Sequence, residues 1–243
     1  MYKSDIESKV FNLNFYRAKY DFLLKNIEEQ KLFLEKNKVD IVKFIIDSRQ
    51  SNLFDKLGVF KKIIFLNSIL NYEKHTTEIE YFPDNNHLEL INANKDDSEL
   101  IGQLVKEVFE NAIIGYSKIS FLKDKISKQQ EVLAIQTYLI DLLNQPNSGI
   151  QLYKDSSINE VVGFSSFSIN NNIIYRAYAG IIPKYWNLHY YENLIYSMIR
   201  FNYIHKIDAI TFGARADNLA LINKFSRVGC KVSSIDYTFV AEV

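Results

Sequence analysis

The chain has 243 residues, of which 47% are hydrophobic and 14% aromatic, so it can bury a substantial core and is not intrinsically disordered. Its formal net charge of zero gives no overall field that would draw it to nucleic acid or to an acidic membrane. The single cysteine, Cys230, excludes an intramolecular disulfide and indicates a reducing compartment. No apolar run approaches the roughly 18 residues of a membrane span, and the opening residues show no apolar signal sequence. We therefore expect a cytoplasmic protein.

The first third of the chain predicts a small α/β domain. A charged helix, a strand, a short helix and a second strand are expected at Asn26–Lys38, Asp40–Asp47, Ser51–Leu57 and Lys61–Leu70. The polar segment Asn71–Asn86 contains Pro83 and shows no periodicity, which is typical of a linker. These patterns place a domain boundary after residue 84, between a domain of residues 1–84 and a domain of residues 85–243.

The second domain begins with a strand, two helices and three strands. The expected strands are His87–Asn94, Ile150–Asp155, Glu160–Asn170 and Asn171–Pro183. Two helices, Asp96–Ala112 and Gln129–Leu143, lie between the first two strands, and Ser98 or Asp96 is the expected N-cap of the first. The segment between these helices is irregular.

The last third of the chain predicts a helix at Lys184–Lys206, a strand at Ile207–Ala214, a helix within Asp217–Val232 and a final strand. A strand that ends at a helix N-terminus leaves free backbone N–H groups, on which a phosphate or pyrophosphate can sit.

This succession resembles the GCN5-related N-acetyltransferase superfamily, which transfers acyl groups from acyl-coenzyme A to amines. Asn218, Leu221, Phe225 and Gly229 fall at the spacing that the family uses for Asn, Ala, Tyr and Gly. The resemblance implies an α/β fold with a mixed, splayed central sheet flanked by helices. The chain departs from the family pattern in two ways: the phosphate loop lacks both of its glycines, and Phe225 stands where a general-acid tyrosine is usual.

A second resemblance covers the start of the chain. FNLNFYRAKY (Phe11–Tyr20) is similar to the Trp-Asp-x-x-Phe-Phe-Gly opening of two-domain sugar-nucleotide N-acyltransferases of the dTDP-fucosamine acetyltransferase type, with Arg17 in place of the glycine. This resemblance implies an enzyme that moves an acyl group from acyl-CoA to the amine of a dTDP-linked amino-deoxysugar, for surface polysaccharide (O-antigen) biosynthesis. The implied partners are acyl-CoA and the nucleotide-linked amino sugar, without nucleic acid or membrane, and a homodimer is a possible assembly.

The loop Asn187–Tyr191 is the predicted binding site for the CoA pyrophosphate, with Lys184 as an added cation. The alternative is an ordinary capped surface helix. The resemblance implies the following coenzyme-binding residues: Ile181, Ile182, Lys184, Asn187, Leu188, His189, Tyr190, Tyr191, Asn218, Leu221 and Phe225.

The catalytic candidates are Tyr237 and Tyr178, either of which could replace the missing tyrosine hydroxyl, and Asn218, which would contact the pantetheine arm or the reacting amide. Ordinary packing of the tyrosines and a plain N-cap at Asn218 are the alternatives. A backbone N–H near Ile181 or Ile182 is the implied donor to the thioester carbonyl.

The acceptor is expected in a cleft between the two domains. Predicted contacts are Asn14, Phe15, Tyr16, Tyr116 and Ser117, with Arg17, Arg176 and Arg215 as clamps for the diphosphate. Core packing of the aromatic rings and structural salt bridges of the arginines are the alternatives. The four histidines do not pair at ligand spacing, so no metal site is expected.

Two other functions remain open. The lost glycines and the missing tyrosine are what a non-catalytic binding module would show if it kept the acyltransferase fold but lost CoA. An acyltransferase that acts on a peptide or polyamine amine is the other possibility.

Overall fold

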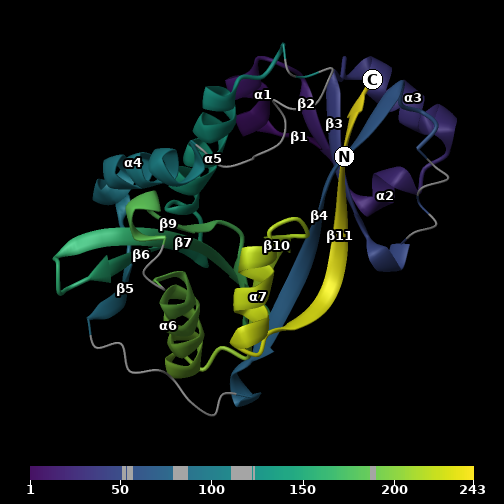
Figure 1. Cartoon of the computed structure of the whole chain (residues 1–243). Coiled ribbons are helices and arrows are strands. Elements are labelled where there is room, and N and C mark those ends of the chain that lie inside the picture. Colours follow the sequence, from purple (N-terminus) through teal and green to yellow (C-terminus); the bar gives the residue numbers. More distant parts are fainter. Residues whose placement is uncertain (51–52, 54–56, 79–86, 111–121, 123, 187–189) are drawn as a thin grey trace. The chain divides into compact units, whose positions relative to one another are not determined.

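A computed structural model of the protein describes residues 1–50, 53, 57–78, 87–110, 122, 124–186 and 190–243. It has a mixed β-sheet flanked by helices, the predicted α/β class (Figure 1). The α-helices are α1 (Asp5–Phe11), α2 (Tyr20–Leu23), α3 (Ile27–Lys36), α4 (Ser98–Phe109), α5 (Lys128–Leu142), α6 (Tyr190–Ile204) and α7 (Leu219–Arg227). The strands are β1 (Tyr2–Lys3), β2 (Phe15–Ala18), β3 (Ile41–Asp47), β4 (Lys62–His75), β5 (Leu88–Asn92), β6 (Ser148–Asp155), β7 (Glu160–Asn170), β8 (Ile173–Arg176), β9 (Ala179–Ile181), β10 (Ala209–Arg215) and β11 (Lys231–Glu242).

The chain divides into two compact units. The first comprises Met1–Leu70, Ile114–Ala134 and Ser234–Val243, and the second comprises Asn71–Ile113 and Ile135–Ser233. The long strands β4 and β11 each pass from one unit into the other. The boundary predicted after residue 84 falls within residues 79–86, outside the described part of the chain, and stays a prediction.

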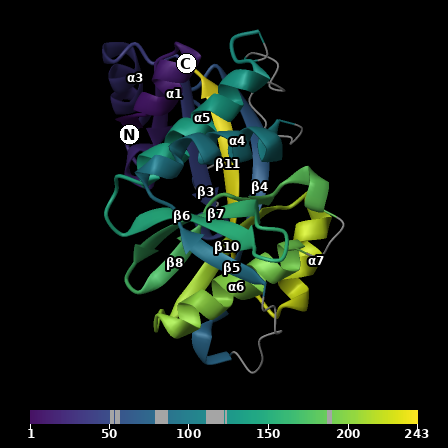
Figure 2. The same cartoon turned by 90° about the vertical axis from the view of Figure 1, so that its left-hand side faces the viewer.

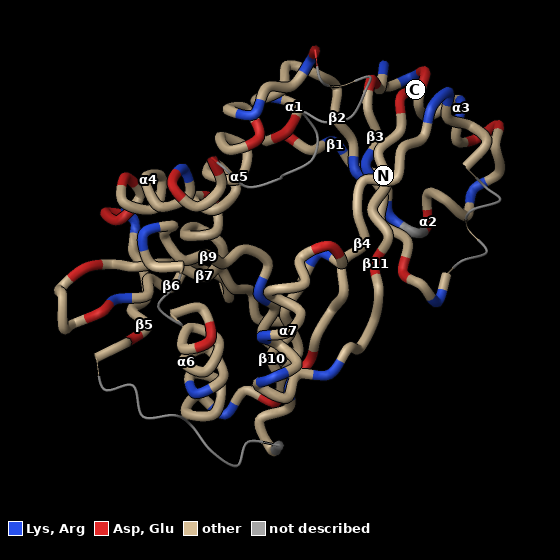
Figure 3. The backbone as a smooth tube through the Cα atoms, viewed as in Figure 1, with Lys and Arg blue, Asp and Glu red and all other residues tan. Residues whose placement is uncertain are grey.

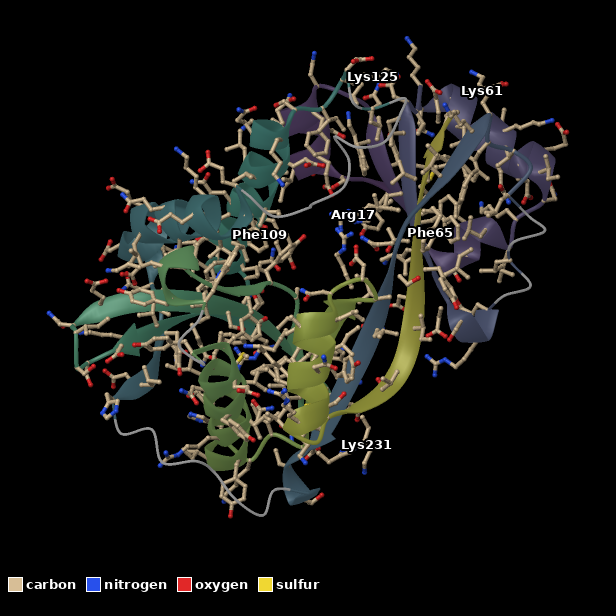
Figure 4. The ribbon with its side chains drawn as sticks, in the orientation of Figure 1. Arg17, Lys61, Phe65, Phe109, Lys125 and Lys231 are labelled. Carbon is tan, nitrogen blue, oxygen red and sulfur yellow. The ribbon has the colours of Figure 1, made fainter. Side chains whose placement is uncertain are left out.

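In the first unit the strand order is β1-β2-β3-β11-β4. β2 runs parallel to β3, and β3 runs antiparallel to β11. Because β3 reads IVKFIID, it places apolar side chains on both faces of the sheet, and two hydrophobic clusters form there. Lys61 and Lys125, labelled in Figure 4, hold the end of the chain: Lys61 Nζ donates to the carbonyl of Val243 at 2.9 Å, and Lys125 pairs with Glu242 at 3.5 Å.

In the second unit the order is β4-β10-β8-β7-β6-β5, with β9 paired to β7. All strand pairs given for this unit are antiparallel except β8 with β10, which is parallel. Helix α4 and the end of α5 cover one face of this sheet and α6 covers the other, as Figures 1 and 2 both show. The ring contacts agree, since Phe109 of α4 meets Phe164 while Tyr190 of α6 meets Tyr153.

The segment predicted as one strand at Asn171–Pro183 is two strands, β8 and β9, with a β-bulge between them. Pairs Ser168↔Tyr175 and Ser165↔Ala179 leave two residues on β7 opposite three on the partner segment. The extra residue breaks the ladder and bends the strand. The continuous strand was a wrong prediction because a bulge leaves little trace in hydrophobic periodicity.

Other element boundaries also differ from the prediction. Strand β4 continues to His75, so the polar segment that begins at Asn71 is not wholly a linker. The helix predicted from Lys184 is a 3₁₀ turn at Pro183–Tyr185, followed by α6 from Tyr190. Neither Ser98 nor Asp96 caps α4; Asn94 instead caps the preceding 3₁₀ turn, with its side chain accepting from the N–H of Asp96 at 2.7 Å.

None of the described helices combines the length and apolar character that a bilayer crossing requires. Charged residues of both signs occur in each unit (Figure 3), in keeping with the net charge of zero.

Candidate functional site

A pocket of about 100 Å³ opens in the second unit just after the last pair between β8 and β10, where the chain continues into β9. Helices α4, α6 and α7 supply the rest of its wall, including Phe109 at the end of α4 (Figure 4). The pocket is lined by Phe109, Arg176, Ala177, Tyr178, Ala179, Tyr191, Met198, Phe212, Gly213, Leu221 and Phe225.

The pairing of the strands explains why the pocket lies there. β8 stays in register with β10 as far as the pair Arg176↔Phe212. After that pair the chain continues into β9, which pairs with β7 and does not belong to the continuous order of strands that contains β10. The backbones of β9 and of the end of β10 therefore separate, and the residues after the bulge line the opening.

Ser166 on β7 fixes the bulge by bonding Tyr178 through main chain and side chain. Its N–H donates to the carbonyl of Tyr178 at 2.7 Å, while the N–H of Tyr178 donates to the Ser166 hydroxyl oxygen at 2.9 Å. The backbone polar groups of the irregular segment are thus satisfied without a regular ladder.

Beyond the bulge, alternate residues of β9 direct their backbone N–H and C=O groups away from β7. The N–H of Ile182 donates to the carbonyl of Val162 at 2.9 Å, so Ile182 belongs to a hydrogen-bonded pair. Because such pairs alternate in an antiparallel ladder, Ile181 and Ala179 direct their N–H and C=O groups away from β7. The Trp186 indole supports this geometry, since its Nε1–H donates to the carbonyl of Ile181 at 2.7 Å. Of these residues, Ala179 lines the pocket.

Aromatic rings make much of the pocket wall apolar. Phe225 is buried and contacts Phe212 and Tyr72, with ring centroids 4.9 and 5.1 Å away. Tyr178 packs edge-on against Phe109 at 6.0 Å and also contacts Tyr138 of α5. The position where the family pattern has a tyrosine is therefore occupied by a buried phenylalanine ring.

Tyr191 adds a phenol to the wall. Burial raises the pKa of Tyr191 to about 12, so its hydroxyl stays protonated near neutral pH and can serve as a hydrogen-bond donor. Lys224 of α7 lies over this ring, with its Nζ 5.6 Å from the centroid.

Arg176 is the charged residue of the pocket lining and is itself only 5% exposed. Its Nη1 donates to Gln151 Oε1 at 2.7 Å and to Ser165 Oγ at 3.3 Å, and its guanidinium carbon lies 5.5 Å from the Phe167 ring centroid. Burial lowers the pKa of Arg176 to about 9, which leaves it charged at neutral pH.

The residues predicted to bind the pyrophosphate are only partly described, since Asn187, Leu188 and His189 lie outside the described residues. Lys184 is exposed and pairs with Glu160 at 3.2 Å. Tyr185 also donates to Glu160, and these hydrogen bonds hold the pKa of that carboxyl below its ordinary value. Tyr190 donates to Asp155, which raises the pKa of Tyr190 to about 12. The cation and both phenols near the start of α6 thus contact carboxylates of the β6–β7 hairpin.

Asn218 caps α7, as the plainer alternative expects: its side chain accepts from the N–H of Leu221 at 3.2 Å. Arg215 forms an ion pair with Asp217 at 2.6 Å. Among the predicted coenzyme residues, Tyr191, Leu221 and Phe225 come together in the pocket wall, and the predicted acceptor residue Arg176 and the predicted catalytic residue Tyr178 join them.

The remaining predicted acceptor residues belong to the first unit or lie outside the described residues, as Tyr116 and Ser117 do. Phe15 is fully buried and Tyr16 is 8% exposed, so burial supports the core-packing alternative for both rings. Arg17 pairs with Glu7, and the Asn14 side chain donates to the carbonyl of Lys38 at 3.0 Å.

The other predicted catalytic tyrosine, Tyr237, also lies in the first unit. It sits on β11 opposite Ile46, and its ring is 6.5 Å from that of Phe65. Tyr178, by contrast, belongs to the second unit. In the described part of the chain, no group of three or more His, Cys, Asp or Glu residues could hold a metal ion.

Sequence reasoning missed the other residues that line the pocket: Phe109, Ala177, Ala179, Met198, Phe212 and Gly213. The available signal was small residues, Ala177, Ala179 and Gly180, within a segment otherwise rich in Ile and Tyr. Small residues inside a strand often mark a bulge or a close backbone approach.

The class of fold follows from this geometry: it is the fold of the GCN5-related N-acetyltransferases. Neither a protein-family model nor a curated protein sequence matches the chain.

Solved structures match it at low identity. One is a functionally unknown conserved protein from Staphylococcus epidermidis, with a TM-score of 0.59 and 12% identity over 89% of this chain and 78% of that one. Another is a GCN5-related N-acetyltransferase from Sphaerobacter thermophilus, with a TM-score of 0.59 and 10% identity over 89% of this chain and 66% of that one, just under two thirds. A GCN5-related N-acetyltransferase from Kribbella flavida has a TM-score of 0.57 and 8% identity over 88% of this chain and 73% of that one. Identities this low establish a likeness of fold.

Proposed function

We propose that this protein is an acyl-CoA-dependent N-acyltransferase whose pantetheine and thioester occupy the pocket between β8–β9 and β10. The observation that carries the proposal is the bulged strand itself. It separates two neighbouring strands and turns the N–H of Ala179 to the open edge, beside apolar rings suited to an acyl chain. The Sphaerobacter and Kribbella proteins of similar fold are GCN5-related N-acetyltransferases, which supports this proposal.

The chemistry is direct transfer within a ternary complex. The acceptor amine attacks the thioester carbonyl carbon, so that a C–N bond forms, the C–S bond breaks and the thiolate of CoA leaves. The N–H of Ala179 donates to the carbonyl oxygen as negative charge develops on it. The proton lost by the amine passes to water or to the thiolate. A thiol with a pKa of about 8.5 is a tolerable leaving group without a general acid, which suits the phenylalanine at position 225.

The acceptor we propose is the amine of a dTDP-linked amino-deoxysugar. This assignment rests on the similarity of Phe11–Tyr20 to the opening of the two-domain sugar-nucleotide N-acyltransferases. Amines of a peptide or a polyamine are the competing acceptors.

Two measurements test the proposal. Calorimetric titration with CoA, acetyl-CoA and longer acyl-CoA thioesters should show binding. Thiol release should require an amine from a panel of dTDP-amino sugars, a polyamine and a peptide.

Ala179→Pro should lower kcat by about 10²–10³-fold and leave acyl-CoA affinity unchanged, because it removes an oxyanion donor that the β7 ladder does not use. Tyr178→Phe and Tyr237→Phe then ask whether either hydroxyl contributes.

A specific observation favours a second candidate, a binding module without activity. Phe225 is packed into a ring cluster, and Lys184 is paired with Glu160 near the start of α6. If neither CoA nor any acyl-CoA binds, this module is the better description and the enzyme proposal fails.

A further inference from the structure

Arg176 carries a buried charge that no described residue neutralises. Its Nη1 bonds the neutral groups of Gln151 and Ser165, whereas Nε and Nη2 are enclosed and make no hydrogen bond in the described structure. No carboxylate of the described residues forms an ion pair with it, in contrast to Arg17 and Arg215. Desolvation is accordingly the cause of its lowered pKa.

A buried cation destabilises the folded protein unless an anion or further hydrogen bonds compensate the lost hydration. Two unused donors on one planar guanidinium match the two oxygens of a carboxylate in a bidentate pair. The remaining pocket wall is mostly apolar, which suits a ligand that carries a small anionic group on an apolar chain.

We propose that Arg176 binds a carboxylate carried by the ligand of this pocket. The proposal rests on the proposed N-acyltransferase function and narrows its substrate class. A cavity of about 100 Å³ has room for a short group. Whether the acyl donor or the amine acceptor carries it, the group is a carboxylate that lies a few carbons from the reacting carbonyl or amine. Because Nε and Nη2 are enclosed, lining side chains must shift to admit it, and the unbranched Met198 rearranges most readily.

The carboxylate has two sources, which separate assays distinguish. In the donor assay, calorimetry compares the affinities of malonyl-, succinyl- and glutaryl-CoA with those of propionyl-, butyryl- and valeryl-CoA, which have the same numbers of acyl carbons. In the acceptor assay, thiol release from acetyl-CoA compares alanine with ethylamine, which lacks only the carboxylate.

Three variants accompany both assays. Arg176→Met removes the charge and retains an unbranched apolar chain, and Arg176→Lys retains the charge without the planar fork. Arg200→Met is the matched control, since Arg200 is exposed on α6. Thermal unfolding should show that Arg176→Met keeps the unfolding temperature of the wild type or raises it, because an uncompensated buried charge is lost.

The wild type should favour the carboxylate-bearing ligand of one assay by about tenfold or more, as a bidentate charged pair allows. Arg176→Met should abolish this preference, Arg176→Lys should restore part of it, and Arg200→Met should keep it. Binding of acetyl-CoA without a carboxylate preference in either assay, or a preference that survives Arg176→Met, overturns the inference and leaves the proposed function intact. Failure to bind any CoA thioester overturns both.

Discussion

Ser166 and Tyr178 form three hydrogen bonds across the bulge: the Ser166 N–H and hydroxyl donate to the carbonyl of Tyr178 at 2.7 and 3.1 Å, and the hydroxyl oxygen accepts from the Tyr178 N–H at 2.9 Å. A regular ladder would bring the tyrosine N–H to a backbone carbonyl instead. The hydroxyl therefore replaces a ladder partner at the point where the strand must bend, and the neighbouring Ala177 and Ala179 are held at the pocket.

Replacing Ser166 with alanine removes this substitute acceptor. The N–H of Tyr178 then lacks its partner in a part-buried position, which should lower the free energy of unfolding by about 1–3 kcal/mol. Urea denaturation measures this loss, and calorimetry should show weaker acetyl-CoA binding. Ser168→Ala, on an exposed residue of the same strand, should change neither quantity. Unaltered stability and affinity in Ser166→Ala would mean that the bulge does not depend on the hydroxyl.

Gly180 permits close packing of α4 on β9. A methyl group added there would lie 2.3 Å from Cγ1 of Val108, so α4 must move or the strand must shift. We expect Gly180→Ala to lower the free energy of unfolding by about 1–3 kcal/mol. Gly58→Ala is the control, because an added methyl meets nothing within 4 Å. The double variant with Val108→Ala should recover part of the loss in a double-mutant cycle, and strict additivity would show that this contact is not the cause.

Glu7 links folding of the first unit to pH. Burial alone would raise the pKa of Glu7, but Arg17 and the hydrogen bond from Ser4 together place it below its ordinary value. A carboxyl whose pKa is lowered on folding stabilises the fold fully above its unfolded pKa of about 4.3, and this stabilisation disappears as the pH falls through the folded value.

Glu7→Gln should therefore be less stable than the wild type near pH 7, and the difference should shrink under acid conditions. Urea denaturation at a series of pH values between neutral and strongly acidic measures the effect. Glu28→Gln, at an exposed side chain of α3, should follow the wild-type curve. A difference between Glu7→Gln and the wild type that is constant with pH would contradict the assignment.

The order of elements was largely predictable, because each carries its own periodic signal. Strand β7 has the predicted bounds Glu160–Asn170, and its hairpin turn at Asn171 and Asn172 has the positive φ angles that asparagine tolerates. The extension of β4 to His75 could not be predicted, since its polar residues are accommodated by pairing within the sheet rather than by an apolar pattern.

The candidate site was predicted in part, and the correct predictions concern residues recognised by their side chains. Tyr191, Leu221 and Phe225 were predicted from the resemblance to the family pattern along two helices, and all three line the pocket. The bulge escaped prediction because it is a property of pairing between β7 and its partner, which no single segment encodes. Arg176 was predicted to clamp a diphosphate. Its burial beside Gln151 depends on the pairing of neighbouring strands, so it could not be predicted from the sequence either.

The phenylalanine at position 225 provides the sharpest test of how the thiolate leaves. Phe225→Tyr puts a hydroxyl into the cluster with Phe212 and Tyr72, so the free energy of unfolding should fall by about 1–3 kcal/mol. If departure of a thiolate needs no acid, kcat should stay within about threefold of the wild type, well short of the 10²–10⁴-fold that general acid catalysis supplies. Phe65→Tyr, on a ring that is 51% exposed, should alter neither stability nor kcat. A rise in kcat of tenfold or more in Phe225→Tyr, with its pH profile changed, would show that the natural site lacks an acid which the reaction can use.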